Sequence, residues 1–351
     1  MESREIKKLD ERKLGPAKRK TVHPTQDQLI LHEPLLPDRP IPYLIRPAIE
    51  GVDLIQWGQN NRSIIEAHLN QHRALLLRGF KIQDVERFEA FALGTSAGGL
   101  LEYVDRTTPR HSEGGKSERV YISTIYPAEH SINPHNEGTY WTQWALKVYF
   151  CCLKAPAEGG QTPIYDVHRV HNRIEPEIRQ RFLEKRWMLV RNYHPGFGLP
   201  WQEVFQVQTR DEVERYCRTH DIQYEWLDGQ HLRTRSIRPA IHYHPKTGDA
   251  LWFNHATFYH HTSLDPTTRD ALVNEFGLDG LPYNTWYGDG TAIDPEEIRH
   301  IREAYQLEKV MFNWQEGDIL MLDNMYIAHA RQPYVGERRI VVAMTEPVAS
   351  T

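Results

Sequence analysis

The sequence predicts an α+β fold in which helices pack around a β core of the sandwich, jelly-roll or barrel type. Many short β-like segments follow one another without the strand–helix–strand rhythm of a doubly wound parallel sheet. The chain has 351 residues, 40% hydrophobic and 25% charged, which is enough to bury a sizeable core. We therefore expect a single domain over residues 33–351, preceded by a mobile basic tail over residues 1–32.

Apolar spacing and capping residues predict the helices. Residues 62–71 and 84–93 carry apolar side chains at helical spacing. Thr209 precedes a glutamate at the third helical position, which is the pattern of a capping box. Asp294 is followed by a proline and two glutamates, which marks the start of a helix that we expect to end near Lys309.

Short apolar runs between these helices predict the strands. The stretch 33–47 is rich in proline and should be extended rather than helical. Residues 245–249 predict a hairpin turn, because a glycine is available there for a positive φ. The remaining segments that we expect to be strands are 74–77, 146–152, 188–193, 241–244, 250–253, 318–322 and 339–344.

Charge and cysteine content exclude several classes of protein. The 42 basic and 47 acidic residues give a net charge of −5, so we expect neither nucleic acid nor an anionic membrane as a partner. Cys151, Cys152 and Cys217 cannot form a disulfide framework or a CxxC zinc site, which suits a reducing compartment such as the cytoplasm. No apolar run reaches the roughly 18 residues that a membrane span needs. We expect a soluble protein with a small-molecule partner.

A histidine and a carboxylate stand at metal-ligand spacing. His135 and Glu137 are two residues apart, and alternate side chains of an extended chain share one face. His329 follows the apolar run 319–322 and a turn-like Asp-Asn pair. Two imidazoles and one carboxylate on one face of Fe(II) leave adjacent positions for a bidentate oxoacid and O₂. The His-x-Glu spacing alone fits equally well a histidine that caps a turn beside a glutamate that faces water.

The charge of this ligand set indicates the kind of co-substrate. Two neutral imidazoles and one carboxylate leave a ferrous site at net +1, which favours an anion such as 2-oxoglutarate. Its far carboxylate needs a cation, and Arg338 and Arg339 follow His329 on the next strand-like segment. An arginine fork supplies paired N–H donors to a carboxylate. One of the two arginines should point inward.

An ordered set of motifs surrounds these residues. They are INPHNEGTY (132–140), GGQTP (159–163), YGDG (287–290), WQEGDILMLDN (314–324), AHARQPY (328–334) and GERR (336–339). With these motifs, roughly residues 70–348 resemble the taurine dioxygenase-type (TauD/TfdA) superfamily of Fe(II)/2-oxoglutarate-dependent oxygenases, and especially its SyrP-like branch in natural-product biosynthesis. The set is far more specific than any one of its members.

The resemblance implies a fold and an activity. The fold is a double-stranded β-helix, or jelly-roll, core wrapped by helices. The cofactors are Fe(II), 2-oxoglutarate and O₂, with release of succinate and CO₂. The expected reaction hydroxylates an unactivated C–H bond of an amino acid or an amino-acid-derived intermediate, either free or tethered to a carrier protein. The alternative to hydroxylation is that the same iron chemistry ends in desaturation, cyclisation or C–C cleavage.

The resemblance also assigns roles position by position. His135, Glu137 and His329 match the metal triad of the family. Thr162 matches the threonine that helps to bind the far carboxylate of 2-oxoglutarate. Arg339 matches the arginine that pairs with this carboxylate, and Arg338 is the alternative.

Two positions depart from the pattern of many relatives. Glu137 stands where many relatives have aspartate, and halogenating relatives have alanine or glycine there, so Glu137 favours oxygenation over halogenation. Ala343 lies near the position of a second arginine that some members use for an anionic substrate, and this weakens the case for a sulfonate substrate.

The substrate side of the site is less defined. Asn133, Asn254 and Arg331 are candidates to contact the substrate, although each has an equally plausible structural role. We expect His255, His260 and His261 to be core or surface residues, because the triad is already complete. Segments 98–120 and 194–206, rich in glycine and loop-forming residues, are the expected lids.

Two other classes of protein remain open from the residues alone. One is a zinc hydrolase or a metal-dependent binding protein that uses the same three side chains. The other is an oxygenase-like scaffold that serves only as an interaction protein. The complete triad argues against the scaffold, whereas succinate formation that depends on Fe(II), O₂ and 2-oxoglutarate separates an oxygenase from the first class.

Overall fold

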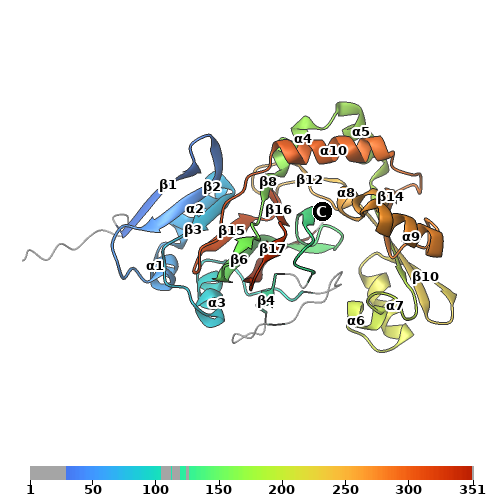
Figure 1. Ribbon diagram of the computed structural model, residues 1–351, viewed down its shortest axis with the longest axis horizontal. Coiled ribbons are helices and arrows are strands. Elements are labelled where there is room, and N and C mark those ends of the chain that lie inside the picture. Colours follow the sequence, from blue (N-terminus) through green and yellow to red (C-terminus); the bar gives the residue numbers. More distant parts are fainter. Residues whose placement is uncertain (1–28, 104–111, 113–118, 124–125, 350–351) are drawn as a thin grey trace, which may run out of the picture.

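The computed structural model describes residues 29–103, 112, 119–123 and 126–349 (Figure 1). Most of the predicted basic tail, residues 1–28, lies outside this range, and β1 (Ile30–Leu36) begins before the tail was expected to end. The large sheet of the described chain has the strand order β1-β2-β3-β15-β6-β18-β4. Its other strands are β2 (Arg39–Pro47), β3 (Ala74–Leu77), β15 (Ile319–Asp323), β6 (Gln143–Lys154), β18 (Arg339–Ala349) and β4 (Tyr121–Ile122).

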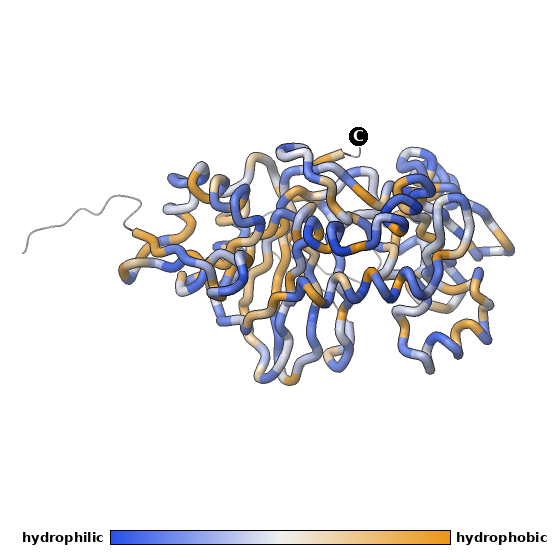
Figure 2. The backbone as a smooth tube through the Cα atoms, turned by 90° about the horizontal axis from the view of Figure 1, so that it is seen from above, coloured by the Kyte–Doolittle hydropathy of each residue, from blue (hydrophilic) through white to orange (hydrophobic). Residues whose placement is uncertain are grey.

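The central strand β6 shows why this sheet is buried on both faces. Its sequence is almost continuously apolar, as expected for a strand that is covered on two sides. Val148 and Phe150 point into one hydrophobic cluster, and Tyr149 and Cys151 point into another. Figure 2 shows the apolar stretches gathered along the central strands. The sheet therefore separates two hydrophobic cores.

Three helices cover one face of the large sheet. They are α1 (Leu54–Asn60), α2 (Arg62–His72) and α3 (Val85–Gly94). Asp53 and Asp84 accept hydrogen bonds from backbone N–H groups in the first turns of α1 and α3, so both act as N-caps. Phe88 and Phe91 are fully buried against the same cluster as Tyr149.

A small sheet packs against the opposite face. Its order is β5-β16-β8, formed by β5 (Ile132–His135), β16 (Ile327–Arg331) and β8 (Ile164–Asp166). Side chains of this sheet and of β6, β15 and β18 belong to one hydrophobic cluster. The ring of Phe150 on β6 lies 4.8 Å from the ring of His329 on β16. A two-stranded ribbon, β7 (Glu158–Gly159) with β17 (Tyr334–Val335), extends the edge of this region.

The remaining elements form a second lobe and a helical cover. A four-stranded sheet has the order β10-β11-β9-β14 and shares a hydrophobic cluster with two helices. Figure 1 shows α4, α5 and α10 together at one edge of the structure. The elements are β9 (Trp187–Tyr193), β10 (Gln223–Asp228), β11 (His231–Arg238), β14 (Tyr283–Tyr287), the hairpin β12 (Ile241–Tyr243) and β13 (Ala250–Trp252), α4 (Val167–Arg173), α5 (Pro176–Lys185), α6 (Trp201–Phe205), α7 (Arg210–Thr219), α8 (Ala256–Tyr259), α9 (Pro266–Phe276) and α10 (Pro295–Leu307).

The predicted elements are largely confirmed. Thr209 and Glu212 form the capping box of α7. The 245–249 turn joins antiparallel β12 and β13, with Gly248 at φ +75°. Helix α10 ends at Leu307, two residues earlier than expected. The stretch 33–47 is extended as predicted, but it forms the β1–β2 pairing rather than a simple lead-in.

Cys151, Cys152 and Cys217 are free and buried. Burial raises the pKa of the Cys152 thiol to about 12 and raises that of Cys151 as well. No helix in the described part of the chain is long and apolar enough to cross a membrane.

Buried His242 makes the stability of the fold depend on pH. Its ring packs against Trp144 and Phe253, and burial lowers its pKa to about 4. The unfolded chain, with a histidine pKa near 6.5, therefore binds a proton that the folded chain does not, and stability is lost as pH falls from about 6.5 towards 4. His242→Phe should keep the ring packing and lose less stability over this range. Urea unfolding at pH 7 and pH 4.5 measures it, and an equal loss in both proteins would contradict the assignment.

Candidate metal centre

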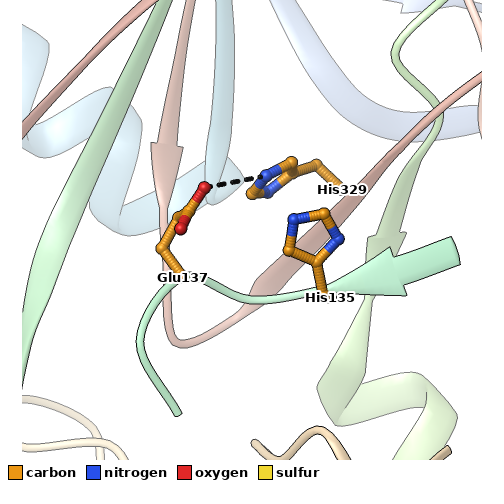
Figure 3. A group of neighbouring side chains, drawn as sticks. All are labelled: His135, Glu137 and His329. Carbon is orange, nitrogen blue, oxygen red and sulfur yellow. Dashed lines mark ion pairs between the residues drawn. The ribbon is translucent and has the colours of Figure 1, made fainter. Parts of the chain in front are cut away.

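Two histidines and a glutamate converge between the two sheets. His135 ends β5, Glu137 lies in the following turn, and His329 lies in the middle of β16. One ligand atom from each side chain lies within 4.8 Å of the other two, and the described residues contain no other such group. His329 Nε2 lies 3.5 Å from Glu137 Oε1, and the two imidazole centroids are 4.4 Å apart. Figure 3 shows the three side chains directed towards one point.

Strand pairing brings the two histidines together. β5 and β16 are antiparallel, and His329 lies opposite His135 in their register. The chain then turns at Gly138, which has φ +75°, a conformation that favours glycine. A Cβ at this position would lie 2.3 Å from the Trp141 ring, so the turn also requires the small residue. The result is that Glu137 folds back towards both imidazoles.

The donor set fits a divalent cation. His135 Nδ1 donates to the backbone carbonyl of Asn133 at 2.8 Å, which leaves Nε2 as the lone-pair nitrogen. Glu137 is only 3% exposed and His329 only 5% exposed. A carboxylate in so buried a place is stabilised by a cation, and a set of two imidazoles and one carboxylate suits ferrous iron.

Asn324 holds the backbone around Glu137. It is fully buried in the turn between β15 and β16. Its side-chain oxygen accepts from Glu137 N at 2.8 Å, and its amide nitrogen donates to Glu137 O at 3.0 Å and to Ala145 O at 2.8 Å. Asn136 Nδ2 donates to the Asn324 carbonyl at 2.6 Å. This one side chain therefore fixes the position of a triad residue from a distant part of the sequence.

A small cavity lies beside the two histidines. Its volume of about 20 Å³ is enough for about one water molecule. Its lining includes Phe150, Thr162, Arg331 and Arg338. A larger cavity of about 390 Å³ shares Arg338 and Ser123 with it. The Arg338 side chain thus forms part of the wall between the two cavities.

Thr162 and Arg338 are joined in this wall. Arg338 Nη2 donates to Thr162 Oγ1 at 3.3 Å, and Arg338 Nε donates to the Gly160 carbonyl at 3.0 Å. Trp314 Nε1 also donates to Thr162 Oγ1, at 3.0 Å. Burial, followed by the nearby charge of Arg331, lowers the pKa of Arg338 to about 10, which leaves it protonated at neutral pH. A cation and a hydroxyl thus lie side by side at the cavity.

Of the two candidate arginines, the structure places Arg338 and not Arg339 at the cavity. Arg339 begins β18 opposite Lys154, and its side chain is exposed. Arg338 precedes β18 and lines the larger cavity together with Ile340, which belongs to the core between the two sheets. The cavity lining includes Arg338 and not Arg339.

The three substrate candidates have different positions. Asn133 is exposed, and its backbone carbonyl serves His135. Asn254 is buried and does not line the cavity, and its side chain donates to Ala240 O at 2.8 Å and accepts from Ala256 N at 3.0 Å. Arg331 lines the cavity, but it bonds loop carbonyls rather than a carboxylate.

Other predicted positions have mixed outcomes. His255 and His260 are buried and His261 is half-buried. His255 lies closer to the triad than the sequence suggested, with its ring 5.8 Å from that of His135 and a hydrogen bond to Thr139. Of the expected lids, residues 104–111 and 113–118 lie outside the described range, and segment 194–206 includes α6. No sequence pattern identified Asn324 or His255, because their partners are distant in the chain.

Comparison with a family model gives a match over most of the chain. Residues 34–345 match the model described as taurine catabolism dioxygenase TauD, TfdA family. The match includes every residue of the His135, Glu137 and His329 group.

Relatives and solved structures agree with this match. The dapdiamide synthesis protein DdaC of Enterobacter agglomerans is 37% identical over 317 residues, which cover 87% of this chain and 95% of that protein. A clavaminate synthase-like protein of Arabidopsis thaliana is 26% identical over 62% of this chain and 70% of its own length. The structure of PvcB from Pseudomonas aeruginosa is 15% identical, covers 91% of each chain and has a TM-score of 0.55. A second PvcB structure, described as an Fe, alpha-ketoglutarate dependent oxygenase from an isonitrile synthetic pathway, has a TM-score of 0.52 at 15% identity and covers 92% of this chain and 93% of that one.

Asn324→Ala tests the role of the asparagine that holds Glu137. Loss of its hydrogen bonds should lower the free energy of unfolding by about 2–4 kcal/mol. It should also weaken Fe(II) binding by about 10- to 100-fold, because the carboxylate is no longer fixed. Chemical denaturation and anaerobic metal titration measure the two effects.

Asn192→Ala is the matched control. Asn192 is also buried and donates to two backbone carbonyls, those of Asp279 and Leu281, in the second lobe. Its loss should cost similar stability and leave metal affinity unchanged. Equal loss of metal affinity in both variants would show that Asn324 acts only through overall stability.

Proposed function

Because this chain belongs to the TauD, TfdA family of dioxygenases, we propose that it hydroxylates an unactivated C–H bond of an amino acid or an amino-acid-derived natural-product intermediate. The chain is a 2-oxoglutarate-dependent dioxygenase that uses iron and 2-oxoglutarate. The observation that carries the proposal is the convergence of His135, Glu137 and His329 beside a cavity with its own cation. The similarity to a dapdiamide synthesis protein over nearly its whole length supports a natural-product intermediate.

We assign the three converging side chains as the iron ligands. His135 and His329 provide neutral nitrogens and Glu137 provides one negative charge, so the loaded site carries a net charge of +1. Bound iron supplies O₂ activation and C–H oxidation, coupled to conversion of 2-oxoglutarate to succinate and CO₂. Asn324 and the Asn133 carbonyl hold Glu137 and His135 in orientation.

Arg338 and Thr162 are the proposed holders of the far carboxylate of 2-oxoglutarate. The guanidinium offers a charged fork, and the hydroxyl beside it offers a further donor. The cavity of about 20 Å³ is far too small for this co-substrate, and the cavity of about 390 Å³ shares Arg338 and Ser123 with it. Co-substrate binding therefore requires the Arg338 wall to move and to join the two spaces.

We further propose that the facing sheets are the two halves of a jelly-roll core. Strands β15, β6 and β18 supply one half, and β5, β16 and β8 supply the other. Their inward side chains form one hydrophobic cluster, and the metal group lies at its edge. In this proposal residues 33–351 form a single oxygenase domain, and its substrate is a small molecule that is either free or carried by a protein.

The alternatives differ in how well they fit the site. A zinc hydrolase or a scaffold without activity does not agree with membership of a dioxygenase family. Glu137 occupies the position that a halogenating enzyme leaves without a carboxylate, which favours transfer of oxygen. Desaturation, cyclisation and C–C cleavage use the same residues, and product mass separates them from hydroxylation.

Amino acids, both free and carrier-bound, should be screened with Fe(II), O₂ and 2-oxoglutarate. A true substrate should stimulate succinate formation and gain one oxygen, as measured by mass spectrometry. His329→Ala should abolish iron binding and succinate formation because it removes one of three ligands, whereas His300→Ala on α10 should retain both. A product that lacks two hydrogens instead would replace hydroxylation by desaturation.

Arg338→Gln and Arg339→Gln form a matched pair on neighbouring residues. Loss of the charged hydrogen bonds at Arg338 should weaken 2-oxoglutarate binding by about 10- to 100-fold with iron binding retained. Arg339→Gln should change the affinity little, because that side chain is exposed. Anaerobic titration of the visible charge-transfer absorption of the iron complex measures the affinity. A larger effect at Arg339 would return the role to that residue.

A further inference from the structure

Arg331 is a second cation in the pocket of the metal centre. It lies on β16 two residues beyond His329, and both residues line the small cavity. Arg331 is only 4% exposed. Thr162 and Arg338 line the same cavity. The pocket therefore contains two guanidinium groups, of which the proposed function uses one.

The hydrogen bonds of Arg331 all go to neutral acceptors. Nη1 donates to the Tyr126 carbonyl at 2.9 Å, and Nη2 donates to the carbonyls of Pro127 at 2.5 Å and His130 at 2.7 Å. Nε is buried and has no hydrogen-bond partner. Carbonyl groups hold the guanidinium in place without cancelling its charge. One N–H donor also remains for an acceptor that enters the pocket.

Among the described residues, no carboxylate is hydrogen-bonded to either arginine of this pocket. Neither Arg331 nor Arg338 forms an ion pair with a carboxylate in the part of the chain that the structure describes. Glu129, the acidic residue that acts electrostatically on Arg331, is exposed on the loop. Burial lowers the pKa of Arg331, and burial together with the charge of Arg331 lowers that of Arg338. Two neighbouring cations in a poorly solvated pocket are stabilised by an anion of matching charge.

We propose that Arg331 is a specificity-determining positioning residue, which supplies the second positive charge by which the pocket selects a dianionic 2-oxo acid over a monoanionic one. The inference rests on the proposed function, which places the co-substrate beside Arg338 and Thr162. Ferrous iron, Glu137 and the two arginines together carry a formal charge of plus three. A dianion cancels two of these charges and a monoanion only one, so the charge of Arg331 contributes more to binding of the dianion.

A purely structural role predicts a different result. Arg331 also fixes the loop 126–130, which leads into β5 and so to His135. If it served only this purpose, its loss would disturb the pocket equally for every 2-oxo acid. The ratio of two affinities therefore separates the roles, whereas a single affinity does not.

The test uses the full chain loaded with Mn(II) in place of iron and compares 2-oxoglutarate with 2-oxovalerate. The two acids have the same chain length, and only the first has a far carboxylate. Arg331→Gln should reduce the preference for 2-oxoglutarate by about tenfold or more, because it removes a charged partner. Arg331→Lys should weaken the binding of both acids, because the forked contacts to the loop are lost. It should keep most of the preference for 2-oxoglutarate, because it keeps the positive charge. Calorimetric or competition titration gives each affinity.

Two outcomes would overturn the proposal. One is an equal loss of affinity for both acids in Arg331→Gln. The other is a preference for 2-oxoglutarate that falls as much in Arg331→Lys as in Arg331→Gln. Mn(II) affinity and the thermal unfolding midpoint establish that each variant is folded. If Arg331→Gln does not fold, Arg331→Met replaces it, because methionine is of similar length and uncharged. Arg338→Gln is measured alongside. An unchanged preference for 2-oxoglutarate in Arg338→Gln contradicts the proposed function, whereas a preference that falls in Arg338→Gln but not in Arg331→Gln overturns only the proposal for Arg331.

Discussion

The antiparallel pairing of β5 with β16 is the constraint on which the metal centre depends. It places His329 opposite His135 although the two residues are far apart in the chain. Neither strand is long, and β16 is stabilised by its side chains in the core shared with the large sheet. The geometry of the ligand set is thus a property of the packed sheets, and the turn at Gly138 adds the carboxylate to it.

The large sheet gives this centre a rigid support. Its two faces are covered by different elements: helices α1, α2 and α3 bury one face, and the small sheet packs against the other. Asn324 lies at the turn from β15 to β16 and bonds the backbone of Glu137, so the strand that enters the large sheet also fixes the ligand. Hydrogen bonds between rigid elements hold a catalytic group more firmly than a free loop does.

Electrostatics links this support to the choice of co-substrate. Arg338 and Arg331 enter the same cavity from different segments, and their partners are a hydroxyl and backbone carbonyls. Such partners orient the guanidinium groups without neutralising them. The pocket consequently places two cations beside the three converging side chains, and the proposed binding of a dicarboxylate such as 2-oxoglutarate depends on this charge pattern.

The sequence by itself determined the secondary structure and the identity of the three converging residues. Capping residues such as Thr209 and apolar runs such as β6 are local signals, and the spacing of His135 and Glu137 with the motif around His329 identified the triad. Only the tertiary structure placed Arg338 rather than Arg339 at the cavity, showed the hydrogen bonds of the Asn254 side chain to backbone groups, and revealed Asn324 and His255 beside the triad. The physical reason is that these roles depend on which distant backbone group or strand face lies opposite a side chain, and strand pairing sets this relation only when the chain is folded.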